Sequence, residues 1–177
     1  MENSRLQKML EAHKLWIDSN KRQGEPANFC EADLREVDLR EVDLSEASFY
    51  KTNFRGCDLR GSGFYKTNFY KTNLSGCDLR GSDFYKAKLC EVDFRGSDIR
   101  EANFCEVELC EIDLRGSDIR GSDFYKAKVW LRENWIHEDR LHENRLHGDR
   151  FHKNWLVLLS FYSNLSKFYE LSTFSVV

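Results

Sequence analysis

The chain has 177 residues, enough for one ordinary domain or for one solenoid with capped ends. Its 27 Lys and Arg residues against 30 Asp and Glu residues leave a net charge of −3, so no global field favours nucleic acid or an anionic membrane. The charged N-terminal stretch lacks the apolar core of a signal peptide, and the longest apolar-rich run, residues 156–162, is too short to span a bilayer. We therefore expect a cytoplasmic protein that does not bind a membrane.

Residues 1–26 predict an amphipathic capping helix and a linker. Apolar side chains recur every three or four residues over 6–17, and Ser4 with Gln7 has the spacing of a capping box. The predicted helix covers residues 4–19, and its apolar face would close one end of the structure that follows. His13 falls on or beside this face, where we expect a packed, hydrogen-bonded imidazole rather than a metal ligand or a catalytic base.

Residues 27–128 repeat with a period of five. In twenty consecutive units, from Phe29 to Phe124, a large apolar residue (position i) mostly follows a small residue two places earlier (position i−2). Five residues advance an α-helix by about 500°, so no apolar stripe forms on a helix. An odd period also throws successive apolar groups onto opposite faces of a straight strand. Both problems disappear if each unit is a short extended piece followed by a bend, so that the chain winds around its own side chains.

A second period of twenty residues predicts the size of one coil. Segments 55–69 and 75–89 agree at most positions at this spacing, so four units should make one coil. Stacking the coils gives two inner apolar columns, Leu39, Leu59, Leu79, Ile99, Ile119 and Leu44, Phe64, Phe84, Phe104, Phe124. Outside them lie two charged columns that we expect to neutralise each other, Asp38, Asp58, Asp78, Asp98, Asp118 and Arg40, Arg60, Arg80, Arg100, Arg120.

Units such as EADLR, GCDLR, GSDFY and KTNFY resemble the pentapeptide-repeat family, and the resemblance covers residues 27–128. It is to bacterial members of the N-terminally helix-capped type. The resemblance implies an all-β solenoid, a right-handed quadrilateral β-helix of about five coils with an N-terminal α-helical cap. Positions i and i−2 would point inward. Lys88 and Glu108 replace the usual Asp or Asn at i−1 and Gly63 leaves that slot empty, so we expect those faces to be locally loose.

The six cysteines follow the repeat rather than a disulfide framework. Thiols stay reduced in the cytosol, so structural thiols are the prediction. Cys90 and Cys110 occupy equivalent slots twenty residues apart, which makes them candidate neighbours, but we expect no disulfide between them.

Residues 129–177 predict a degenerate C-terminal tail. The phase of the large apolar residues slips by two, and Asn or Asp mostly fills the inward i−2 position, where an unpaired polar group is costly. His137, His142, His147 and His152 recur every five residues but would point in different directions, so we predict no metal site. The codons of His-Glu-Asn-Arg-Leu, read one base later, can encode a pentad such as TKTDF. We hypothesise that the tail is repeat DNA translated in a shifted frame.

Motifs of enzymes are missing from the sequence, which has no Gly-rich phosphate loop, GxSxG, HExxH or zinc-type CxxC pair. We therefore predict no catalytic residue, no cofactor and no enzyme activity. The favoured function is a rigid scaffold that docks a protein partner of unknown identity, and a homodimer through one end of the solenoid is an alternative partnership. The candidate surface comprises Tyr50, Tyr65, Tyr70, Tyr85 and Tyr125 with the arginine column, although for most of these tyrosines we favour simple stacking along the ladder.

The second functional class comes from the family resemblance. Some fluoroquinolone-resistance members mimic DNA and bind type II topoisomerases such as gyrase, which requires a markedly acidic rod. Residues 27–128 carry twenty acidic and sixteen basic side chains, which is a small surplus for a DNA mimic. The aspartate column beside the arginines would repel phosphate, so we expect no direct binding of nucleic acid.

Overall fold

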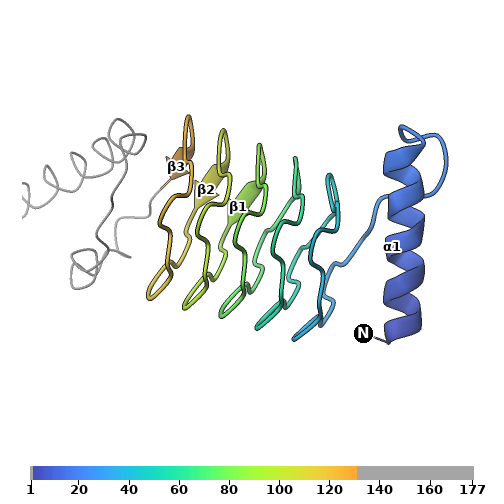
Figure 1. The fold of residues 1–177 in the computed structure, drawn as a ribbon, viewed down its shortest axis with the longest axis horizontal. Coiled ribbons are helices and arrows are strands. Elements are labelled where there is room, and N and C mark those ends of the chain that lie inside the picture. Colours follow the sequence, from blue (N-terminus) through green and yellow to red (C-terminus); the bar gives the residue numbers. More distant parts are fainter. Residues whose placement is uncertain (1, 131–177) are drawn as a thin grey trace, which may run out of the picture.

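The computed structural model describes the backbone of residues 2–130 and the side chains of residues 2–128. It contains one helix, α1 (Asn3–Asp18), and three short strands, β1 (Lys88–Cys90), β2 (Glu108–Cys110) and β3 (Lys128–Trp130). The histidine series, the tail and its shifted-frame hypothesis lie outside the described residues, apart from the backbone of 129 and 130. Figure 1 shows α1 at one end of a row of stacked coils.

Helix α1 begins and ends one residue earlier than the predicted helix of residues 4–19. Glu2 is its N-cap and makes no side-chain capping bond. The predicted capping box is wrong, because Ser4 lies inside the first turn and the Gln7 amide donates instead to the Glu11 carboxylate at 3.0 Å. Leu6 is buried, and further apolar side chains of the helix, Met9 and Leu10, pack against the core of the coils.

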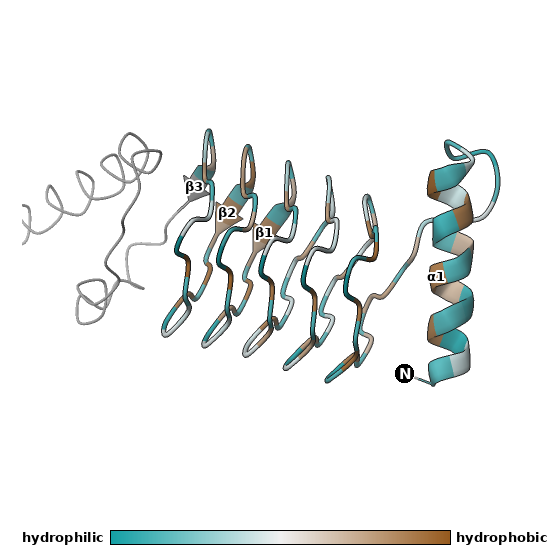
Figure 2. Ribbon diagram, in the orientation of Figure 1, coloured by the Kyte–Doolittle hydropathy of each residue, from teal (hydrophilic) through white to brown (hydrophobic). Residues whose placement is uncertain are grey.

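The coils pair with each other at a spacing of twenty residues. Parallel bridges run from Asn28↔Ser48 to Asn103↔Asp123, and the strands continue the same register, β1 with β2 and β2 with β3. The backbone N–H of Leu79, for example, donates to the Asp98 carbonyl of the next coil at 2.7 Å. One coil therefore takes four pentads, as predicted, and the described residues form a β-helical solenoid. Figure 2 shows apolar and polar residues alternating along the coils.

The interior is filled by positions i and i−2. Most i residues are almost fully buried, whereas Leu114 and Phe124 are partly buried, and the rings of one inner column stack at centroid distances of 4.7–4.8 Å from Phe64 to Phe124. Many i−2 residues are polar, and their hydroxyl groups donate to backbone carbonyls, most of them in the preceding coil. The Thr52 hydroxyl donates to the Phe29 carbonyl at 2.7 Å, and the Ser62 hydroxyl donates to the Leu39 carbonyl at 2.6 Å. Because each of these buried hydroxyl groups has an acceptor, the core holds them at little cost.

Each coil turns its corners at position i+2. All residues at this position from Glu31 to Lys126 have positive φ, between +52° and +75°. Gly121 adopts this left-handed conformation freely, whereas the Glu and Lys residues at other corners adopt it at a cost of about 1 kcal/mol each.

The three strands begin at i−1 positions that carry Lys or Glu in place of Asp or Asn. At most other repeats, the side-chain oxygen of Asp or Asn at i−1 accepts the backbone N–H of i+1, as in Asp83 with Tyr85 at 2.9 Å, and this bends the chain. Lys88 and Glu108 cannot make that turn, so the chain stays extended there. The prediction of loose faces at these two residues is therefore wrong. Gly63 also pairs normally, with Asp43 and Asp83.

Cys90 and Cys110 are joined by a disulfide, which contradicts the prediction of free thiols. In-register pairing of β1 with β2 places their Cα atoms 4.5 Å apart, within the range that a disulfide spans. The twenty-residue period already made the two residues neighbours, and only the assumption of a reducing compartment argued against the bond. The remaining cysteines among the described residues, Cys30, Cys57, Cys77 and Cys105, are free.

Candidate interaction surface

The arginine column forms a continuous ladder of ion pairs with the aspartate column. The Arg80 guanidinium contacts Asp78, two residues earlier, at 2.6 Å and Asp98 of the next coil at 3.5 Å. The same pattern holds from Arg40 to Arg100, and Arg120 pairs with Asp118. Hydrogen bonds from Arg40 lower the pKa of Asp38 to about 2. The expected neutralisation is therefore built into the ladder, and these guanidinium groups are already engaged by carboxylates.

The tyrosines form stacked ladders at the corners of the coils. Tyr50 stacks on Tyr70 and Tyr65 on Tyr85, each with 5.7 Å between ring centroids. This is the stacking that we favoured from the sequence. Tyr125 is 58% exposed, and the other four rings are partly exposed.

A lysine lies over each of these tyrosine rings. The Nζ atoms are 4.8–5.1 Å from the ring centroids, within the range of a cation–π contact; the lysines are Lys51, Lys66, Lys71, Lys86 and Lys126. Several of them also reach a glutamate one coil away, as Lys51 does to Glu31 at 3.4 Å. The sequence signal for these residues is the Tyr-Lys dipeptide at positions i+1 and i+2.

The two tyrosine ladders border one side of the solenoid. Tyr65 and Tyr70 are consecutive corner residues of one coil, and Asn68 lies between them with its side chain exposed. We call this side, with Tyr50, Tyr65, Tyr70, Tyr85 and their lysines, the tyrosine–lysine face. The arginine column lines a different corner, so the structure does not gather the two predicted sets of residues into one site.

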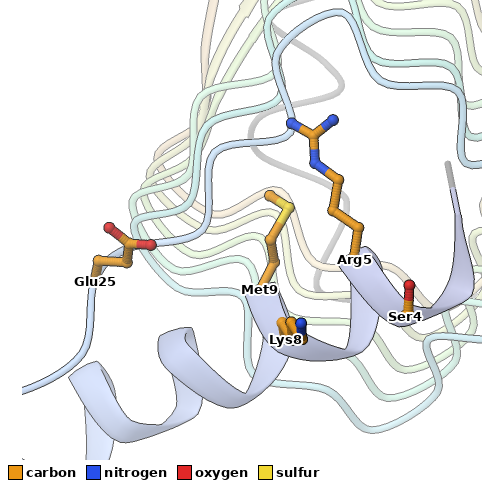
Figure 3. Close-up of a pocket in the computed structure, with 5 residues that line it drawn as sticks. All are labelled: Ser4, Arg5, Lys8, Met9 and Glu25. Atoms are coloured by element: carbon orange, nitrogen blue, oxygen red, sulfur yellow. The ribbon is translucent and has the colours of Figure 1, made fainter.

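The hollows of the described region are open and shallow. One lies beside α1 and is lined by Ser4, Arg5, Lys8, Met9 and Glu25. In Figure 3, Arg5 and Met9 extend to the same side of the helix and Glu25 comes from the connecting segment. No group of three or more His, Cys, Asp or Glu side chains could hold a metal ion within residues 2–128. No helix in this part of the chain is long and apolar enough to cross a membrane.

The free buried cysteines are poor nucleophiles. Burial raises the pKa of Cys57 to about 11 and that of Cys77 to about 12. Their thiols donate instead to carbonyls of the preceding coil, those of Leu34 and Phe54. Because a thiolate is the reactive form of cysteine, these two residues serve packing.

Solved structures of several repeat proteins are similar to this chain. A pentapeptide repeat protein from the thylakoid lumen of Arabidopsis thaliana is 27% identical, with a TM-score of 0.44, over 60% of this chain and 69% of that one. HetL of the cyanobacterium Nostoc, involved in regulating heterocyst differentiation, is 23% identical with a TM-score of 0.35; the match covers 64% of this chain and 52% of HetL. Full-length QnrB1, a plasmid-mediated fluoroquinolone resistance protein, is 20% identical with a TM-score of 0.27 over 63% of this chain and 70% of that one.

Family models decide the assignment. A comparison with curated proteins found no match. The model described as a pentapeptide repeat region matches residues 47–124, and the model of pentapeptide repeats in eight copies matches residues 27–61. Together they cover most of the paired coils. The chain therefore belongs to the pentapeptide-repeat family.

Proposed function

We propose that the protein is a non-enzymatic scaffold, a right-handed rod of about five coils capped by α1, which docks a protein partner through the tyrosine–lysine face. The observation that carries this proposal is the pair of tyrosine ladders, held on a backbone in which every coil is hydrogen-bonded to the next. Aromatic side chains supply much of the binding energy at protein interfaces, and rings already fixed by stacking lose little conformational entropy on binding.

The charge pattern of this face suits a protein rather than nucleic acid. Lysines and glutamates alternate between coils, as in Lys71 with Glu91 at 3.5 Å and Lys86 with Glu106 at 3.6 Å. A face with both signs can complement a partner of mixed charge, whereas a phosphate backbone would meet the glutamates.

Affinity capture with matched variants tests the proposal. The purified full chain, the double variant Tyr65→Ser/Tyr85→Ser and the control Arg80→Ala are compared as bait, after circular dichroism shows that all three are folded. We expect one or more partners to be retained by wild type and Arg80→Ala and lost by the tyrosine variant. Retention by the tyrosine variant and loss by Arg80→Ala would instead place the contact on the arginine ladder.

The second candidate, which comes from the family resemblance, is a DNA-mimicking modulator of a type II topoisomerase, although the twenty acidic and sixteen basic side chains of residues 27–128 leave only a small acidic surplus for a DNA mimic. The pairing of the aspartate column with arginines weighs against it. A gyrase supercoiling assay separates the two candidates. Inhibition or protection from a fluoroquinolone would support the mimic, and no effect at high molar excess supports the scaffold.

A cytoplasmic location stays a proposal, and the Cys90–Cys110 disulfide makes it testable. Reducing compartments keep most thiols free, so a persistent disulfide indicates an oxidising compartment. Alkylation of the protein in intact cells, followed by mass analysis, would detect the bond. Free thiols at both residues would support the cytoplasm.

A further inference from the structure

His13 joins helix α1 to the start of the coils. Its side chain is only 1% exposed, and Nδ1 accepts a hydrogen bond from the backbone N–H of Ala27 at 3.0 Å. Ala27 opens the repeat region, so this bond links the helix directly to the first coil. The contact spans fourteen residues of sequence and crosses the turn at Gly24.

The accepting role of Nδ1 defines the protonation state of the imidazole. A ring nitrogen that accepts a hydrogen bond carries no proton, so the docked side chain is neutral with its proton on Nε2. Among the described residues, Nε2 has no hydrogen-bond partner. A second proton on Nδ1 would face the Ala27 N–H donor to donor and would place a positive charge in a buried site, which is costly.

One charged group near His13 favours the protonated imidazole and so opposes the effect of burial. The Asp43 carboxylate of the first coil favours the protonated imidazole, but burial has the larger influence and lowers the pKa of His13. On the helix side, the Trp16 ring stacks on the His13 ring with 5.7 Å between their centroids. The Lys21 ammonium lies 5.0 Å from the centroid of the Trp16 ring. Lys21 is itself paired with Glu46.

We propose that His13 is a pH-sensitive latch, which holds α1 on the first coil while the imidazole is neutral and releases the helix when it is protonated. Release would uncover the apolar side of the helix, including Leu6 and Met9, and the first-coil residues beneath it. The rod would then expose an apolar end only under mildly acidic conditions. This inference concerns the end of the rod and is independent of the tyrosine–lysine face.

The direction of the pH effect follows from linkage. In a released helix the imidazole has an ordinary pKa of about 6.5, and in the docked helix the pKa is lower. Above about pH 6.5 both states are neutral and docking is at its strongest. Between that value and the lowered pKa, only the released helix binds the proton, so the docking equilibrium weakens by at most about tenfold per pH unit.

Hydrogen exchange measured by mass spectrometry on the full chain tests the latch. Protection factors for peptides of residues 3–18, corrected for intrinsic exchange, are compared with those of residues 74–89 between pH 5 and pH 8. We expect protection of the helix to fall severalfold to tenfold per pH unit below about pH 6.5, while the coil peptides stay protected.

Two variants complete the experiment. His13→Asn keeps an acceptor oxygen close to the place of Nδ1 but does not titrate, so its helix should stay protected at low pH. Asp43→Asn removes the group that favours protonation of the docked imidazole, so the loss of protection should begin at the same pH, extend to lower pH and become larger in total. A helix whose protection is independent of pH in the wild-type chain would overturn the proposal. If His13→Asn fails to dock at any pH, an Asp43→Asn variant that loses no more protection at low pH than the wild-type chain would overturn it as well.

Discussion

Replacing Phe84 should break the rod at its centre. The ring is fully buried and stacks on Phe64 at 4.8 Å and on Phe104 at 4.7 Å. It also meets the tilted ring of Phe69 and the edge of Phe94, which belong to two other columns. Phe84→Ala leaves a cavity that the surrounding coils cannot close, because their backbones are hydrogen-bonded to each other on every side.

The expected loss is at the upper end of the range for such a change. Removing a buried Phe side chain costs about 3–5 kcal/mol, and each ring pair adds about 0.5–1.5 kcal/mol beyond the area that it buries. We therefore expect Phe84→Ala to lower the free energy of unfolding by about 4–5 kcal/mol. Phe84→Leu should cost about 1.5 kcal/mol, because Leu44 already fills the same column in another coil.

The assay is equilibrium unfolding in urea, followed by far-ultraviolet circular dichroism. Phe84→Asp should abolish the cooperative transition, since it buries a charge without a partner. Tyr125→Ala serves as the control and should stay within about 0.5 kcal/mol of wild type, because the Tyr125 ring is exposed. A Phe84→Ala variant within 1 kcal/mol of wild type, or a Phe84→Asp variant with an unchanged melting temperature, would refute the assignment of position i to the interior.

Three further variants probe the links between the coils and α1. Reducing the Cys90–Cys110 disulfide, or replacing both residues by Ser, should cost about 3 kcal/mol for a closed loop of twenty residues, and melting with and without dithiothreitol would show it; identical curves would contradict a structural bond. Gly24→Ala should loosen α1, because Gly24 has φ of +71° and its added Cβ would collide with the Ala12 carbonyl oxygen; faster hydrogen exchange confined to residues 3–18 is the expected result. Thr72→Val keeps the shape of the side chain but removes a buried hydroxyl donor, so it should cost about 1 kcal/mol in urea unfolding, with Tyr125→Ala again as the control.

Periodicity alone predicted the inner and outer columns of the solenoid. The period of five excludes a helix and a straight strand, and the period of twenty determines which coils touch, so the Phe64–Phe84–Phe104 column followed without coordinates. Handedness was carried over from the family, because side-chain spacing is the same for either hand.

Contacts that depend on local bonding could not be predicted in this way. The hydroxyl of Thr52 reaches a carbonyl 23 residues earlier, and sequence spacing does not tell where a carbonyl points. The strands at Lys88 and Glu108 begin where a long side chain replaces the Asp or Asn that closes the turn at i−1, and we interpreted this substitution in the sequence as a sign of local looseness. The Cys90–Cys110 bond was missed because the compartment, rather than the geometry, decided that prediction.

The tyrosine–lysine face was only partly predictable. The four tyrosines of this face and their stacking were named from the sequence, but the position of each lysine over its ring depends on the left-handed corner at i+2. The sequence repeat does not indicate which corner of the coil would face a partner, because all four sides of the coil have the same five-residue pattern.

Pairing at a constant interval of twenty residues makes the length of the rod adjustable in whole steps. Duplicating or deleting a segment such as 55–74 would return every later residue to its own side, with the same kind of neighbour above and below. Each step would change the length by about 4.8 Å and leave both ends untouched. A change of five residues would instead rotate everything beyond it by one side and pair arginines with tyrosines. Insertions or deletions of sixty nucleotides can therefore change the length of the rod in steps of one coil. The contacts that each end of the rod makes would stay the same.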